Sequence, residues 1–243
     1  ATPTPTLTGP FPTPTGLPDL LISYAATIGS PDGVASEYTG LGEIVLTGTL
    51  GAVGRYKCRY NATYLGCVER VTDQYLNAVY SSGSDHLWSD DTMEVWLDVN
   101  FDRAVTQQSD DFHFFVNAAN AVSNYQAGTL ATLTDFTSAV VLDGTLNLNT
   151  DTDTGAIIEW RVPWTSLGVT TPPVAGRVMG FNVELKDNVG GTYQQGPAWV
   201  GGGSNAPNSW GQITLGTEMS PVDLPDWSSM FTAWWGLDDA ADG

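Results

Sequence analysis

The chain has 243 residues, only 14% of them are charged, and the formal net charge is −19. This acidic balance argues against binding to nucleic-acid phosphates or anionic membranes, and no apolar run reaches the roughly 20 residues of a membrane span. The length suits one all-β domain, and a first residue of alanine rather than methionine is expected of a processed, secreted protein, so we expect an extracellular or cell-surface location.

Residues 1–18, ATPTPTLTGPFPTPTGLP, form a Thr/Pro tract that is typical of a stiff, extended spacer. Four threonines alternate along its first half: Thr2, Thr4, Thr6 and Thr8. In an extended strand these four N–H groups point to one side, while the intervening prolines leave the other side without donors. We therefore expect an extended arm that pairs along one edge, against this domain or against a neighbouring subunit.

Four strands are expected in the first third of the chain, at 20–27, 43–49, 52–60 and 64–72. Cys58 and Cys67 are the only cysteines, and folding the last two strands into a hairpin places them almost opposite each other. We expect a cross-strand disulfide and an oxidising compartment, although two buried thiols on facing strands would fit the same pattern. Asn61 begins the sole N-glycosylation sequon, at the hairpin tip, where a glycan would be accommodated.

The stretch 86–102, HLWSDDTMEVWLDVNFD, has the period of two expected of a strand. One face is apolar and should look into a core: Met93, Val95, Leu97 and Val99. The other face is polar apart from one ring: Glu94, Trp96, Asp98 and Asn100. Because Trp88 precedes this strand beside two further aspartates, the stretch predicts a site for a sugar, a hard cation or both.

Later strands are expected at 111–117, as a pair within 129–150, and at 156–162, 177–187 and 210–215. A Gly-rich polar loop, 188–209, precedes the last of them, and no helix of more than two turns is expected. About ten strands joined by Gly, Asp and Asn turns predict an all-β fold, an antiparallel jelly-roll-like β-sandwich over residues 19–215.

Residues 216–243 differ in character, because an acidic end is combined with four large aromatic side chains: Trp227, Phe231, Trp234 and Trp235. The spacing of the first three would allow a short amphipathic helix. So much apolar surface must be covered, either by the domain or by another chain.

Six segments, in order, carry a resemblance: YLGCVERVTD, WSDDTMEVWLDVN, DFHFFVN, IIEWRVPWTSLG, GRVMGFNVELKDN and WGQITL. Together they resemble the family 9 carbohydrate-binding modules and the related DOMON-type β-sandwiches, from about residue 32 to residue 215. The same scaffold also serves haem-binding electron carriers and other secreted domains, so the resemblance is more specific for the fold than for the ligand.

The resemblance implies a sugar site closed by two tryptophans. One lies six residues before a strand glutamate, the spacing of Trp88 and Glu94, and the other lies in the polar loop before the last strand, the place of Trp199. Aromatic faces would stack on pyranose C–H faces while Glu94 accepts hydrogen bonds from hydroxyl groups. Phe115 stands where some members have an arginine, and Trp88 could instead shield the edge of the core.

Two acidic segments have the oxygen-rich spacing of calcium loops: Asp98, Asn100 and Asp102, and Asn149, Asp151 and Asp153. Solvated turns would show the same spacing, but the resemblance implies structural calcium, which members of the family often contain. A haem site would need His86 or His113 with a methionine as axial ligands. Neither a nucleophile elbow nor a phosphate loop occurs in the sequence, so we do not expect an enzyme.

Two functions remain open. In the first, the chain is a structural subunit that assembles with copies of itself into an extracellular filament or sheath, docking through Thr2–Thr8 and the aromatic Trp234 and Trp235. In the second, it is a carbohydrate-binding module that stacks a saccharide between Trp88 and Trp199. The two unusual termini around one domain favour the first function.

Overall fold

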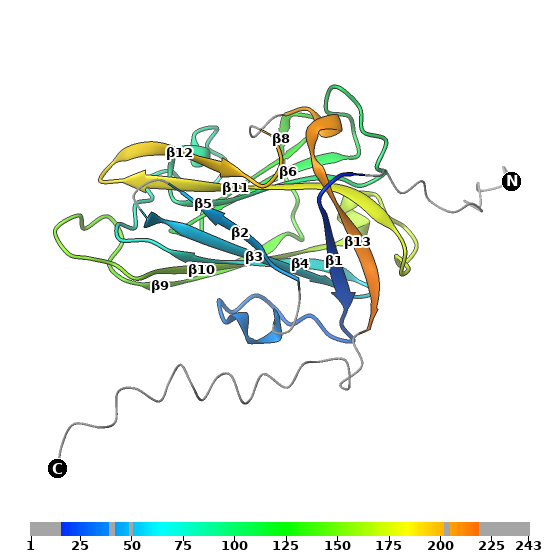
Figure 1. Ribbon diagram of the computed structural model, residues 1–243, viewed down its shortest axis with the longest axis horizontal. Coiled ribbons are helices and arrows are strands. Elements are labelled where there is room, and N and C mark those ends of the chain that lie inside the picture. The colour runs from blue at the N-terminus through cyan, green and yellow to red at the C-terminus, as the bar shows by residue number, and fades with distance from the viewer. Residues whose placement is uncertain (1–15, 39–41, 49–50, 202–204, 219–243) are drawn as a thin grey trace, which may run out of the picture.

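The computed structural model describes residues 16–38, 42–48, 51–201 and 205–218 (Figure 1). The strands are β1 (Asp19–Tyr24), β2 (Ile44–Thr47), β3 (Val53–Tyr60), β4 (Tyr64–Thr72), β5 (Thr92–Asp98), β6 (Asp111–Asn117), β7 (Val122–Gln126), β8 (Thr129–Ala131), β9 (Thr137–Asp143), β10 (Gly155–Pro163), β11 (Val178–Val189), β12 (Thr192–Ala198) and β13 (Gly211–Glu218). The helices within these ranges are 3₁₀ turns: η1 (Ala35–Tyr38), η3 (Leu87–Ser89), η4 (Trp164–Leu167) and η5 (Pro207–Ser209). None of them is long or apolar enough to span a membrane.

The strands form one curled sheet in the order β8-β7-β6-β5-β11-β13-β1-β3-β4-β10-β9, with β12 on β11 and β2 on β3. Figure 1 shows the two layers that result, one containing β5, β6 and β11 and the other containing β3, β4, β10 and β9. The predicted β-sandwich is confirmed. It differs from the prediction in having 13 described strands and in pairing β1 parallel to both β13 and β3, which makes β1 the strand that joins the layers.

The core lies between the layers because each central strand turns its alternate apolar residues inward. Met93, Val95 and Leu97 of β5 are buried there, as the period of two predicted. Across the gap, the Trp160 ring packs against Phe114 and Phe136 at centroid distances of 5.3 and 5.4 Å. The opposite faces of β5 and β6 are buried as well, so both sides of these two strands are largely shielded from water.

The β3–β4 hairpin confirms the predicted disulfide. Cys58 and Cys67 are direct cross-strand partners, and their sulfur atoms are bonded. Asn61 lies in the connecting turn, where its Oδ1 accepts the backbone N–H groups of Thr63 and Tyr64 and its side chain is 9% exposed. This turn geometry does not support a glycan at Asn61.

Several predictions concern residues outside the described ranges: the threonines of the arm, Thr2, Thr4, Thr6 and Thr8, and the aromatics Trp227, Phe231, Trp234 and Trp235. The division into arm, sandwich and C-terminal extension therefore stays a prediction.

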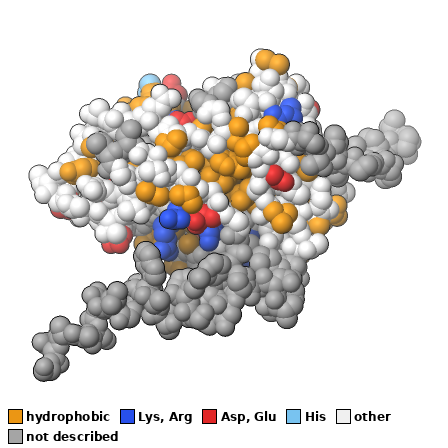
Figure 2. Space-filling view, in the orientation of Figure 1, with side chains coloured by type: hydrophobic (Ala, Val, Ile, Leu, Met, Phe, Trp, Pro, Cys, Tyr) orange, Lys and Arg blue, Asp and Glu red, His pale blue; other side chains and the backbone are white. Residues whose placement is uncertain are grey.

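Figure 2 shows apolar side chains gathered across the middle of the face that carries β1 and β2. These two strands expose Leu21 and Val45 to solvent.

Candidate functional site

A hollow of about 740 Å³ lies on the face of β6 and β7 that points away from the core. Strand residues His113, Phe115 and Tyr125 form its floor. Its walls come from separate loops: Asp85 and Trp88 before β5, the segment 105–107 between β5 and β6, and Asn205 before β13. A hollow of this volume is within the range of small-ligand sites in proteins.

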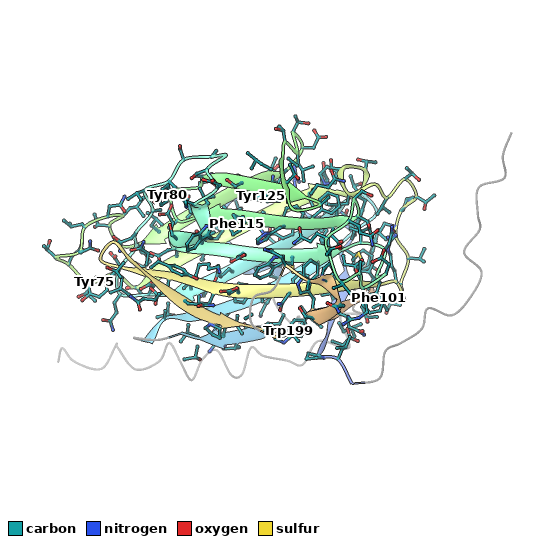
Figure 3. All side chains as sticks on the ribbon, turned by 90° about the horizontal axis from the view of Figure 1, so that it is seen from above. Tyr75, Tyr80, Phe101, Phe115, Tyr125 and Trp199 are labelled. Carbon is teal, nitrogen blue, oxygen red and sulfur yellow. A yellow bond between two sulfur atoms is a disulfide. The ribbon has the colours of Figure 1, made fainter. Side chains whose placement is uncertain are left out.

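The floor of the hollow is aromatic. The His113 ring lies 4.1 Å from Phe115 and is stacked at 4.6 Å on Trp96, its buried cross-strand partner on β5. Tyr125 reaches the same place from the neighbouring strand, with its ring 5.8 Å from Phe115. Figure 3 shows Phe115 and Tyr125 close together on these strands. Edge and stacked contacts of this kind hold the rings in fixed orientations.

Trp88 forms part of the wall and is 39% exposed. Trp88 lies on the turn η3, in which the neighbouring Leu87 is buried. The carbonyl oxygen of Leu87 accepts a hydrogen bond from the Thr92 hydroxyl at 2.7 Å. The edge of the Trp88 ring meets Tyr193 of β12 at 5.0 Å. One face of a large aromatic side chain is thus presented to the hollow by a turn that is anchored on both sides.

An ionic cluster lies beside the floor, on the same outward face of the neighbouring strands β5 and β11. The Glu94 carboxylate is 2.5 Å from His113 Nε2 and 2.7 Å from Lys186 Nζ, and Lys186 also contacts Glu184 at 2.7 Å. Burial raises the pKa of Glu184 to about 7 and lowers the pKa of Lys186 to about 8. Burial also lowers the pKa of His113 to about 3, so the imidazole is neutral and donates its single N–H to Glu94.

This cluster changes the role expected of Glu94. The residue is 3% exposed and does not line the hollow, whereas His113 does. A ligand in the hollow would therefore meet the imidazole, which Glu94 holds in place, rather than the carboxylate itself. Trp88 lines the hollow, whereas Glu94 lies beside the floor as the cross-strand partner of Phe115 and contacts His113.

Trp199 lies elsewhere. It follows β12, packs edge-on against Phe181 of the core at 6.3 Å, and is close enough to Gly211 that a Cβ there would be 2.8 Å from its ring. It does not line the hollow, and Figure 3 shows it apart from Phe115 and Tyr125. The structure therefore brings Trp88 together with Tyr125 and not with Trp199.

The predicted calcium segments are only partly suited to an ion. Both oxygens of Asp98 already accept backbone N–H groups, from Phe101 and Arg103, and Asn100 and Asp102 are exposed. Asp98 does approach two other carboxylates, those of Asp110 and Asp111. In the second segment, the two oxygens of Asp153 accept the N–H groups of Leu76 and Thr145, while Asn149 is exposed and Asp151 is half-buried. Calcium at either segment stays a prediction.

A third cluster, which we call the carboxylate clamp, fits a cation better: Asp73, Asp91 and Asp187, with oxygen atoms within 4.8 Å of one another. Within the part of the chain that the structure describes, neither buried oxygen of Asp187 accepts a hydrogen bond, and the same is true of Asn188 Oδ1. Burial, reinforced by Asp73, raises the pKa of Asp91 to about 9 and that of Asp187 to about 7. Buried oxygens without donors are the ligands that calcium takes.

The comparisons with known proteins agree with this architecture. A family model described as carbohydrate family 9 binding domain-like matches residues 37–218. Endo-1,4-beta-xylanase A of Thermoanaerobacterium saccharolyticum is 29% identical over 142 residues, which are 58% of this chain and 10% of the xylanase. Exoglucanase XynX of Acetivibrio thermocellus is 30% identical over 140 residues, 58% of this chain and 11% of that protein. The chain thus spans about a tenth of the length of these relatives.

Solved structures give the same fold. A family 9 carbohydrate-binding module from Caldicellulosiruptor kristjanssonii in complex with cellotriose superposes with a TM-score of 0.65 at 20% identity, over 86% of this chain and 98% of the module. The same kind of module in complex with glucose gives 0.65 at 21% identity, over 84% and 98%. The favoured expectation, a self-assembling filament subunit, is therefore wrong, because the family match and these neighbours support the carbohydrate-binding alternative.

Proposed function

Because the chain belongs to the carbohydrate family 9 binding domain-like family, we propose that it is a non-catalytic, extracellular module that binds a saccharide in the hollow beside Trp88. The observation that carries the proposal is that aromatic rings and amide side chains line the same hollow, whose volume suits a small ligand. The disulfide between Cys58 and Cys67 supports the extracellular location.

The aromatic residues would provide most of the binding free energy. Trp88 and Tyr125 would stack against the C–H faces of pyranose rings, with Phe115 between them as an apolar floor. Tyr125 takes the place that sequence reasoning gave to Trp199. Each such contact removes apolar area from water, which contributes roughly 25 cal/mol per Å² buried.

The polar residues would recognise hydroxyl groups. The side-chain amides of Gln107 and Asn205 lie 3.3 Å apart in the wall, and each has both a donor and an acceptor. His113 donates its N–H to Glu94, which leaves its other ring nitrogen as an acceptor. Lys186 Nζ lies 2.7 Å from Glu94 and holds this side chain in place. Glu94 and Lys186 therefore act as positioning residues for the imidazole.

The charge of the hollow and of the whole chain indicates which class of glycan would bind. Asp85 is the only charged residue among those described as lining the hollow, and the whole chain carries a net charge of −19. An uncharged glycan suits this surface better than one that carries uronate or sulfate groups. Since the solved neighbours were obtained with cellotriose and glucose, and the relatives are a xylanase and an exoglucanase, we propose neutral β-linked glucans and xylans as ligands.

The test is calorimetric titration of the protein with cellotriose and xylotriose. Trp88→Ala and Tyr125→Ala should each weaken binding about tenfold or more, which corresponds to the loss of roughly 1.4 kcal/mol. Tyr80→Ala is the matched control, because Tyr80 is 38% exposed and does not line the hollow. Equal affinity in the wild type, Trp88→Ala and Tyr125→Ala would show that the saccharide binds elsewhere.

We also propose that calcium occupies the carboxylate clamp. Asp73, Asp91 and Asp187 would supply carboxylate oxygens and Asn188 a side-chain carbonyl. The ion would neutralise three buried carboxyl groups and so stabilise the fold. Calcium should raise the melting temperature of the wild type and have little effect on Asp187→Asn, a comparison that differential scanning calorimetry can make.

A further inference from the structure

The carboxylate clamp and the hollow share a segment of chain. Asp91 is three residues beyond Trp88 and directly precedes β5. Its carboxylate accepts the backbone N–H groups of Asn77 and Asn188, and its own N–H donates to Asn77 at 2.9 Å. The cluster therefore ties the chain after β4 and the end of β11 to the turn that carries Trp88.

A second contact runs from β11 into that turn. The Asn188 side chain donates through Nδ2 to the carbonyl oxygen of Ser89 at 2.6 Å, which leaves its Oδ1 for a cation. Asn188 is also the cross-strand partner of Tyr193, and Tyr193 supports the edge of the Trp88 ring. Both supports of Trp88, its own turn and Tyr193, thus depend on residues adjacent to Asp187.

We propose that calcium in the carboxylate clamp holds Trp88 at the wall of the hollow and thereby raises the affinity for glycan. This inference rests on the proposed saccharide function. It adds regulation of the glycan affinity by calcium, which binds outside the hollow. Without the ion, the three carboxyl groups lie with oxygens within 4.8 Å of one another, and among the described residues no group donates a hydrogen bond to either oxygen of Asp187. The turn and the β11–β12 hairpin then lose their common anchor.

The coupling is expected to be reciprocal. If calcium strengthens glycan binding by some factor, glycan strengthens calcium binding by the same factor. Coupling between neighbouring sites is commonly about 5- to 150-fold, and we expect the low end of this range because the ion does not touch the glycan. Removal of calcium should thus weaken cellotriose binding roughly 5- to 10-fold.

The experiment follows two signals in the full chain, with calcium and after removal of calcium by EDTA. The first is cellotriose affinity by calorimetry. The second is the fluorine NMR signal of Trp88 in protein labelled with 5-fluorotryptophan, assigned by its loss in Trp88→Phe. Asp187→Asn removes the unpartnered carboxylate, and Asp135→Asn is the matched control, since Asp135 is exposed and lies on a distant turn.

Support for the inference would be a Trp88 signal that sharpens and an affinity that rises with calcium in the wild type and in Asp135→Asn, but not in Asp187→Asn. A wild type that binds calcium without any change in the Trp88 signal or the affinity would overturn it, as would a failure to bind calcium. If no glycan binds under either condition, the proposed function fails, and the Trp88 signal alone then decides whether calcium orders the turn.

Discussion

Replacing Glu69 by glutamine should abolish a large part of the pH dependence of stability. Glu69 faces the core from β4, is 1% exposed, and is the direct cross-strand partner of Tyr56 on β3. Gly54 leaves room for the pair, because a Cβ at that position would lie 2.8 Å from both Glu69 Oε1 and the Tyr56 hydroxyl. Burial raises the pKa of Glu69 from 4.5 to about 8, and the Tyr56 hydroxyl opposes the shift only in part.

The sign and size of the pH dependence of stability that Glu69 causes follow from proton linkage. The folded state holds the proton more tightly than the unfolded state, so the favourable contribution of Glu69 is complete below about pH 4.5 and is lost as the pH rises through about 8. Each pKa unit corresponds to about 1.4 kcal/mol. Between about pH 5 and pH 8 the wild type should lose roughly 3 kcal/mol through this group, whereas a glutamine cannot ionise.

The assay is urea unfolding of the wild type and Glu69→Gln at both pH values, with calcium held constant. The difference in unfolding free energy between the two proteins should change by roughly 3 kcal/mol in favour of glutamine at the higher pH. Other titrating groups are common to both proteins and cancel. A difference that stays constant across this range would show that Glu69 is ionised in the folded state and that the argument from burial fails.

Three further predictions concern stability. Reduction of the disulfide between Cys58 and Cys67, which are nine residues apart, should cost about 2–3 kcal/mol in urea unfolding, because the unfolded chain regains the freedom of that loop. Gly155→Ala should cost roughly 2–4 kcal/mol in thermal unfolding, since its φ is +141° and a Cβ would lie 1.9 Å from a backbone oxygen. Lys186→Met should cost roughly 3–5 kcal/mol near neutral pH, because it leaves Glu94 and a second buried carboxyl without their cation. That loss should shrink as the pH is lowered.

The sequence was sufficient where the determinants are local. The alternation of Met93, Val95 and Leu97 predicted the central strand, and the spacing of Cys58 and Cys67 about a turn predicted the disulfide, because register in a hairpin is set by the turn itself. Trp88, which the sequence places just before β5, lies in the wall of the hollow.

The sequence was insufficient where the site joins distant segments. Asp73, Asp91 and Asp187 belong to three separate parts of the chain, so no local spacing reveals the carboxylate clamp. Tyr125 was not singled out for the same reason, since only the pairing of β6 with β7 brings it to Phe115. Trp199 lies apart from the hollow because β12 occupies part of the expected loop before it, and its ring packs against Phe181.

The parallel pairing of β1 with β13 determines how the module bears tension. The chain enters at the start of β1 and leaves at the end of β13, and residues 19–22 lie beside residues 212–215. Opposite pulls on the start of β1 and the end of β13 act along both strands, so the hydrogen bonds between these strands share the load and break together rather than one by one.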